Sequence, residues 1–244
     1  MKLLLTSGGV TNDSIRQALV DLLGKPIEEA SALCIPTAIH ALPGGAAHAY
    51  RFISGTGSNP MTGLGWKSLG VLELTALDTT AHQAAQLARW KSLGVLELTA
   101  LPGIDRELWL PTVFEADALL VNGGDPLYLH HWMRQSGLAN LLPSLSSVYV
   151  GLSAGSMIMT PRIGQDFVNW TPPTGGDETL GLVDFAIFPH LDHPDLPDNS
   201  MADAERWAAT LSSPSYAIDD QTAIKVTGGE VKVISEGHWR SFEP

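Results

Sequence analysis

The sequence predicts an α/β protein, with a doubly wound, mostly parallel sheet flanked by helices and a C-terminal β-hairpin. Three observations predict it. Short apolar runs bounded by Gly, Pro or Thr alternate with helical periodicity, which is typical of parallel strands joined by crossover helices. The chain has 244 residues, of which 44% are hydrophobic, enough to bury one large core. Two late apolar runs flank Gly228-Gly229, a pair typical of a tight hairpin turn. We expect residues 1–244 to form a single domain.

The first expected elements are a buried strand, a capped helix and a second strand. The strand Lys2–Thr6 is too short for the core of a signal peptide or for a membrane span. A helix is expected over 12–23, with Asn12 or Asp13 as its cap, and Gly24 and a proline end it. The strand Ser31–Ile35 contains the single cysteine, which we interpret as a small buried side chain without a catalytic role. This cysteine usage fits a reducing cytoplasm.

Residues 37–65 are rich in small and polar side chains and are expected to form a surface loop with partial helix. Residues 66–77 are then repeated letter for letter at 90–101, an offset of 90 − 66 = 24 residues. Each copy contains a plausible strand, and residues 79–89 between them are compatible with a helix. Because the copies have identical propensities, the sequence does not decide which one occupies the sheet.

The rest of the chain continues the alternation. Helices are expected at 105–114, 127–136 and 201–211, and strands at 116–121, 148–150, 180–188, 216–218, 222–226 and 230–235. We expect the final hairpin to close one end of the sheet.

The strand at 148–150 runs directly into Gly151-Leu152-Ser153-Ala154-Gly155. A strand, a glycine-flanked turn and a helix are the context in which G-x-S-x-G exposes a nucleophilic serine at the carboxyl end of a sheet. The N–H of Ala154, at the start of the helix, could then stabilise an oxyanion. The alternative is an ordinary turn in which Ser153 caps the helix.

A nucleophilic serine needs a base, and the histidines after Ser153 are His190, His193 and His238. His190 is favoured because it follows a long apolar strand and would emerge at the sheet edge that carries Ser153. The acids between the serine and His190 could orient its imidazole: Asp166, Asp177, Glu178 and Asp184. The order Ser, acid, His is that of elbow-type hydrolases.

Two glycines and a histidine pair complete the candidate site. Gly123-Gly124, at the end of the adjacent strand, offers a second N–H for an oxyanion, or is simply a tight turn. His190 and His193, with Asp192 or Asp195, could instead bind a metal, but this spacing lacks the further ligands that specify zinc. We therefore predict no metal and no cofactor.

These pieces resemble a known family. Asn122-Gly123-Gly124-Asp125, the Ser153 pentapeptide and Pro189-His190 are similar to peptidase E, the aspartyl dipeptidase group of serine peptidases. The opening Leu-Thr-Ser-Gly-Gly and the segment from Ile35 to Ala38 extend the resemblance over residues 1 to about 220. It implies a class I glutamine amidotransferase-like (flavodoxin-like) fold, with serine where amidotransferases carry cysteine at the elbow.

The resemblance also implies the roles of the site residues: Ser153 as nucleophile, His190 as base, and the N–H groups of Gly124 and Ala154 as oxyanion hole. Asp166 is the nearest counterpart of the family's acid, and Glu178 is the alternative. The implied activity is hydrolysis of dipeptides with an N-terminal aspartate through an acyl-enzyme. A cyanophycinase-like or other β-aspartyl peptide hydrolase, and a non-catalytic amidotransferase-like binding protein, are the alternatives.

Composition limits the partners. The formal net charge is −12 and the 14 Lys and Arg residues are scattered, which argues against nucleic acid. No apolar run approaches the length of a membrane helix. Recognition of an acidic substrate needs a cation, and Arg162 and Arg206 are candidates that the sequence does not distinguish. The sequence predicts a cytoplasmic enzyme acting on a small peptide, of undetermined oligomeric state.

Overall fold

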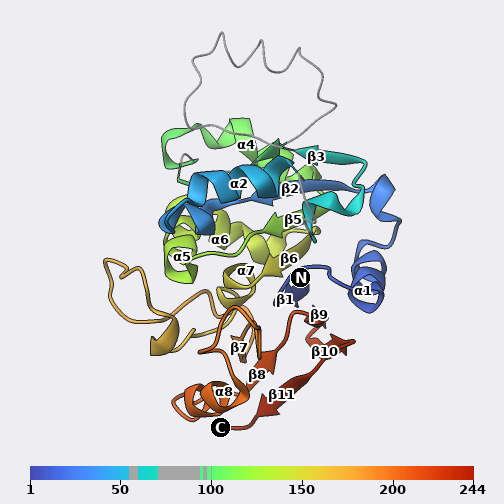
Figure 1. Cartoon of the computed structure of the whole chain (residues 1–244). Helices are drawn as coiled ribbons and strands as arrows, with labels where there is room; N and C mark the ends of the chain where they lie inside the picture. Colours follow the sequence, from blue (N-terminus) through green and yellow to red (C-terminus); the bar gives the residue numbers. More distant parts are fainter. Residues whose placement is uncertain (55–59, 71–93, 96–97, 100) are drawn as a thin grey trace.

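A computed structural model describes residues 1–54, 60–70, 94–95, 98–99 and 101–244 (Figure 1). Its larger sheet has the strand order β10-β9-β1-β6-β5-β2-β3, and β4 also pairs with β2. The bounds of these strands are β1 Lys2–Thr6, β2 Ser31–Ile35, β3 Ser68–Gly70, β4 Gly94–Val95, β5 Ala118–Val121, β6 Val148–Leu152, β9 Thr222–Thr227 and β10 Glu230–Ser235. The pairs from β1 through β6, β5 and β2 to β3 are parallel, whereas β9 and β10 are antiparallel. The predicted mostly parallel sheet is confirmed.

Helices cover both faces of this sheet, because successive side chains of a strand point to opposite faces. On β1, Leu3 and Leu5 pack into one core cluster and Leu4 into another. The first cluster includes residues of α4 Arg106–Glu115, α5 Pro126–Gln135, α6 Leu138–Leu141 and α7 Ala154–Met157, and the second includes residues of α1 Asp13–Leu23 and α2 Gly45–Ser54. This arrangement is the doubly wound fold that the sequence predicts.

Local signals at two turns behave as expected. Asn12 accepts a hydrogen bond from the Ile15 N–H and caps α1, which ends at Gly24 in the left-handed conformation. Gly228 and Gly229 have φ angles of 59° and 85°, which suit the tight turn between β9 and β10. This hairpin closes the β1 side of the large sheet, as predicted. Cys34 is buried on β2, and burial raises the pKa of its thiol.

A second sheet was not expected from the sequence. It has the order β11-β8-β7, with β7 Ala186–Phe188, β8 Ser215–Ile218 and β11 Trp239–Phe242, and α8 Met201–Ala208 packs beside it (Figure 1). The predicted strand over 180–188 is therefore wrong over residues 180–185. The N–H groups of Leu180 and Leu182 donate to carbonyls of Ile158 and Met159, just after α7, so this stretch lies along the end of that helix.

Both copies of the repeat contribute to the same edge of the large sheet. In the first copy Ser68–Gly70 pairs with β2, and in the second Gly94–Val95 pairs with β2. Gly70 and Gly94 occupy equivalent positions in the two copies, and each pairs with Leu33. The possible helix at 79–89 lies outside the described residues. No helix within the described ranges is long and apolar enough to cross a membrane.

Candidate active site

Ser153 stands at a strained turn between β6 and α7. Its φ and ψ are 50° and −113°, a conformation that non-glycine residues rarely adopt and that costs of the order of 1–3 kcal/mol. Although Ser153 occupies the cap position of α7, its side chain makes no capping hydrogen bond. The helix-cap interpretation therefore does not explain this serine.

The surrounding backbone holds the turn in place. The Thr6 carbonyl, at the end of β1, accepts hydrogen bonds from the Ser153 N–H (3.0 Å) and the Ser156 hydroxyl (2.7 Å). The two glycines of the pentapeptide are required by close approach. A Cβ on Gly155 would lie 2.3 Å from the Val121 carbonyl oxygen, and one on Gly151 would lie 2.7 Å from the Gly155 backbone. The flanking glycines thus bring α7 onto β5 and β6 at the serine.

The strand end after β5 lies beside this turn. A Cβ on Gly123 would be 3.3 Å from Cβ of Ser153, and Gly124 has a φ of 139° with its backbone pressed against Ala38. Ala154 is the first residue of α7, so its N–H has no partner within the helix. Among the described residues, neither the Ala154 nor the Gly124 N–H makes a hydrogen bond. Two backbone donors are therefore available next to Ser153.

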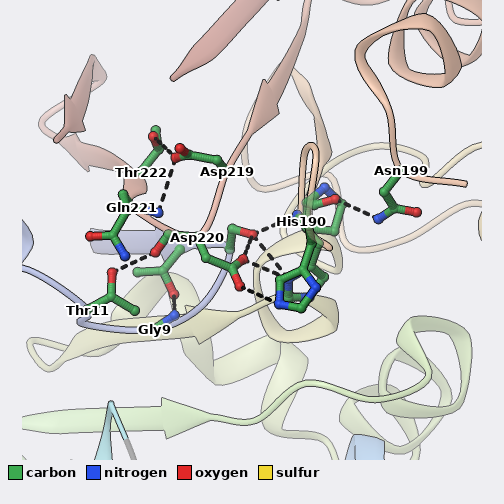
Figure 2. Close-up of polar contacts among 12 residues, drawn as sticks. Gly9, Thr11, His190, Asn199, Asp219, Asp220, Gln221 and Thr222 are labelled. Carbon is green, nitrogen blue, oxygen red and sulfur yellow. Dashed lines mark hydrogen bonds and ion pairs between the residues drawn. The ribbon is translucent and has the colours of Figure 1, made fainter. Parts of the chain in front are cut away.

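His190 lies just beyond β7, a strand of the small sheet, and Figure 2 shows its ring beside Asp220. Its Nδ1 is 2.7 Å from Oδ1 of Asp220, and both side chains are partly buried, with 22% and 29% of their surface exposed. An ionised carboxylate only accepts hydrogen bonds, so Nδ1 carries the proton and Nε2 is left as an acceptor. This is the tautomer that a general base needs.

Asp220 belongs to the turn between β8 and β9, where the chain passes from the small sheet to the large one. Gly8 allows it to approach, because a Cβ there would lie 2.8 Å from the Asp220 side chain. Burial alone would raise the pKa of Asp220. Hydrogen bonds from His190 and Ser7, with His190 and His193 nearby, outweigh burial and lower the pKa below its ordinary value. The carboxylate therefore stays ionised next to His190.

The structure does not bring Asp166 to His190. Asp166 is exposed on the short helix Gln165–Phe167, and the alternative Glu178 has 64% of its side chain exposed. Asp177, another acid of that segment, is buried beneath Arg162, with the Arg162 Nε 2.9 Å from its Oδ1. The position beside Nδ1 of His190 is filled instead by Asp220, a residue that follows His190 in the chain.

His190 and His193, which the sequence also offers as metal ligands, both face the carboxylate of Asp220. His193 Nε2 lies 3.7 Å from Oδ2 of Asp220, so the two histidines face the two oxygens of one carboxylate. His238, the third candidate base, contacts Asp192 and Asp219. Within the described ranges, no group of three or more His, Cys, Asp or Glu side chains is arranged to hold a metal ion.

Ser153 and His190 line one pocket with a volume of about 340 Å³, a size suited to a small molecule. One wall comes from the ends of β5 and β6 and the other from the segment at 39–52, which includes most of α2. The described residues that line the pocket are Ile39, His48, Arg51, Phe52, Asn122, Gly123, Gly124, Leu152, Ser153 and His190. Arg51 is the one lysine or arginine among them. The pocket thus combines the candidate nucleophile and base, and Gly124 of the candidate oxyanion hole, with the cation Arg51.

Comparisons with known proteins show which family the chain belongs to. The sequence profile of Peptidase family S51 matches residues 79–234, which is well over half of the chain and includes Ser153, His190 and Asp220. The chain belongs to Peptidase family S51. The predicted relationship to the peptidase E group is confirmed. The family match begins between the two copies of the repeat, so it contains the copy at 90–101 and not the copy at 66–77.

Individual proteins similar to this S51 chain are named peptidase E or peptidase. It is 37% identical over 91 residues to peptidase E of Streptomyces coelicolor, a match over 35% of this chain and 37% of the relative's length. The crystal structure of a candidate peptidase E protein from Listeria monocytogenes EGD-e has a TM-score of 0.55, with 20% identity over 97% of this chain and 98% of that one. A peptidase from an acI-B1 Actinobacterium has a TM-score of 0.57, with 17% identity over 99% and 96%. These structures support the fold over the whole chain.

Proposed function

We propose that this chain is a serine peptidase that hydrolyses short peptides, with Ser153 as nucleophile, His190 as general base and Asp220, in place of Asp166, as the orienting acid. One observation carries the proposal. Ser153 is held in a strained turn that leaves its hydroxyl unused by the helix cap, and it shares a pocket with His190, whose Nδ1 is held by Asp220. A nucleophile, a base and a group that orients the base form the minimum machinery for acyl transfer.

In the proposed reaction, His190 Nε2 takes the Ser153 proton as Oγ bonds to the scissile carbonyl carbon. The tetrahedral intermediate then collapses, the carbon–nitrogen bond breaks, and Nε2 gives the proton to the leaving amine. Water repeats the sequence on the acyl-enzyme and releases the acid. Asp220 keeps the imidazole in the required tautomer and stabilises the imidazolium that forms in each half-reaction.

The oxyanion of both intermediates would be stabilised by the N–H groups of Gly124 and Ala154. The available backbone donors flank Ser153 from two neighbouring strands, as the elbow geometry requires. They are fixed by the protein backbone, so they need no reorganisation as the charge develops. The chemistry uses side chains and backbone groups of this chain and needs no cofactor.

The preferred substrate in this proposal is a dipeptide with an N-terminal aspartate, whose side-chain carboxylate binds to Arg51. Its guanidinium lines the pocket beside His48, with Nη2 of Arg51 2.9 Å from Nδ1 of His48. A guanidinium suits a carboxylate because it offers parallel N–H donors. The two arginines considered from the sequence have other contacts: Arg162 pairs with Asp177 and Arg206 with Asp203. The single, buried cysteine fits the proposed cytoplasmic location.

The decisive experiment measures hydrolysis of Asp-X, Glu-X, β-aspartyl and neutral X-X peptides by the wild-type protein and by Ser153→Ala. We expect turnover of Asp-X by the wild type and loss of turnover in the variant. Preference for β-aspartyl peptides would favour the cyanophycinase-like alternative. Binding of Asp-X without turnover would favour a non-catalytic binding protein, and equal turnover by Ser153→Ala would remove the serine from its role.

The role of Arg51 is tested by Arg51→Gln, with Arg206→Gln as a matched control outside the pocket. A charge-assisted hydrogen bond contributes about 1.5–3 kcal/mol, so kcat/KM for Asp-X should fall roughly 10- to 100-fold in Arg51→Gln. Neutral dipeptides should be affected little, and Arg206→Gln should behave as wild type. An equal loss for acidic and neutral substrates would assign Arg51 to folding or to the peptide backbone instead.

A further inference from the structure

A single buried hydroxyl links the candidate base to the candidate acid. Ser7, directly after β1, is fully buried and donates a hydrogen bond from Oγ to Oδ1 of Asp220 at 2.6 Å. The same Oγ accepts a hydrogen bond from the backbone N–H of His190 at 2.7 Å. His190 Nδ1 in turn lies 2.7 Å from the Asp220 oxygen that Ser7 contacts. The hydroxyl therefore holds the backbone of one residue and the side chain of the other in one closed triangle.

The backbone of His190 needs such a restraint. Its φ is 56°, and this left-handed region is unfavourable for a residue with a side chain. Asp192, two residues later, has a φ of 52°, so the loop after β7 contains two residues in this unfavourable conformation. Hydrogen bonds hold its start: the His190 N–H donates to Ser7, the Asn199 side chain donates to the Pro189 carbonyl at 3.0 Å, and the Leu191 N–H donates to the Ile218 carbonyl at 3.1 Å. Ser7 accepts the hydrogen bond from the backbone N–H of His190 itself.

The contact also joins the two sheets. Ser7 follows a central strand of the large sheet, whereas His190 follows an edge strand of the small sheet. Asp220 lies in the turn that connects them (Figure 2). Small relative movements of two sheets change the position of a side chain carried at their junction, and a misplacement of about 1 Å can cost roughly 100-fold in rate. A hydroxyl bonded to both sides restricts that movement.

We infer that Ser7 is a positioning residue of the reaction, which fixes the His190 ring relative to Asp220 through one hydroxyl bonded to both. This inference rests on the proposed function for its effect on rate, and on geometry alone for its effect on the His190–Asp220 hydrogen bond. Ser7 does not touch the reacting atoms. Its contribution is the orientation of the imidazole before Ser153 transfers its proton.

The test compares Ser7→Ala with Ser136→Ala, which also removes a buried serine hydroxyl but at the end of α5. Loss of a group that supports a functional residue typically costs about 10- to 100-fold, so kcat of Ser7→Ala on Asp-X should fall by that factor while KM stays within about two-fold. Ser136→Ala should lose stability without losing kcat. Ser7→Cys, of nearly the same shape with a weaker donor, should lie between wild type and Ser7→Ala, and it carries the test if the alanine variant does not fold.

A second readout does not depend on turnover. The proton on His190 Nδ1, held by Asp220, should give a downfield proton NMR signal in the wild type, identified by its absence in Asp220→Asn. We expect the signal to be lost or shifted in Ser7→Ala and retained in Ser136→Ala. Wild-type kcat together with an unchanged signal in Ser7→Ala would overturn the inference. If the wild type hydrolyses no peptide, the signal still decides the positioning role, whereas the proposed function fails separately.

Discussion

The proposed site has two halves, a nucleophile half around Ser153 and a base half around His190, and they are built in different ways. The nucleophile half is local: Ser153, its flanking glycines and the Ala154 N–H all belong to one strand, turn and helix of the large sheet. The base half is assembled from distant segments, since Ser7 and Asp220, which are in contact, lie 213 residues apart in the chain. The first half depends on backbone strain and close packing, and the second on hydrogen bonds across the junction of two sheets. Substitutions in the two halves should therefore impair the protein in different ways.

The largest effect is expected in the base half. Asp220→Asn leaves the volume unchanged but can hold the wrong tautomer of His190, a change that costs about 10⁴-fold in the serine protease triad. We expect a fall in kcat of roughly 10³- to 10⁴-fold on Asp-X, with the fold retained by circular dichroism. Asp166→Asn is the matched control and should keep wild-type kcat. Loss of activity in Asp166→Asn with activity retained in Asp220→Asn would restore the acid favoured by the sequence.

This contrast also explains what could be predicted from the sequence. The order of the elements, the pentapeptide turn, the hairpin and the caps depend on neighbouring residues, so their patterns are visible in the chain. Gly151 and Gly155 indicate the close packing at Ser153, because a Cβ at either position would clash with the backbone. The same local reasoning correctly placed Gly123 and Gly124 beside the elbow.

Asp220, the proposed acid, could not be found in that way, because its position depends on the second sheet. The sequence favours an acid between Ser153 and His190 on the order of elbow-type hydrolases, but a triad is defined by geometry and occurs in several chain orders. One signal was available: Asp219 and Asp220 follow a predicted strand, at the carboxyl end where functional side chains gather. The partner strand β11 and the turn at Asp220 became evident only in three dimensions.

In the nucleophile half, a substitution that disturbs the close packing should reduce activity. In Gly124→Ala the new Cβ would lie 2.4 Å from the Ala38 backbone, so the strand end must shift and move its N–H away from the oxyanion. Removal of one oxyanion donor costs about 10²- to 10³-fold in kcat, and we expect the lower figure together with a reduced melting temperature. Gly24→Ala, also at a positive φ but with nothing near its Cβ, is the control and should lose only about 1 kcal/mol of stability and no kcat. Full activity in Gly124→Ala would argue against this donor.

The base half should also respond to pH in its stability. The pKa of Asp220 is lowered in the folded protein by His190 and Ser7 despite burial. A lowered pKa contributes stability above the unfolded value, near 3.9 for aspartate, and this contribution is lost as the pH falls through the folded pKa. Melting temperatures measured from about pH 5 to pH 3 should therefore fall more steeply for wild type than for Asp220→Asn. Ser153→Ala, in the other half, should parallel wild type, and parallel curves for all three proteins would show that Asp220 has no such linkage.

The smallest effect is expected at the far edge of the large sheet, where the two copies of the repeat meet β2. Gly70 and Gly94 each pair with Leu33, so each copy contributes its equivalent residue to the same place. Deleting residues 71–94 joins Gly70 to Val95 and leaves one intact copy of the repeated sequence. The edge is separated from β6, which carries Ser153, by β2 and β5. We expect kcat and KM on Asp-X within about two-fold of wild type and no fall in melting temperature, because the deletion preserves the strand sequence that pairs with β2. Loss of activity in a folded deletion variant would mean that the nucleophile half depends on more than its own strand, turn and helix.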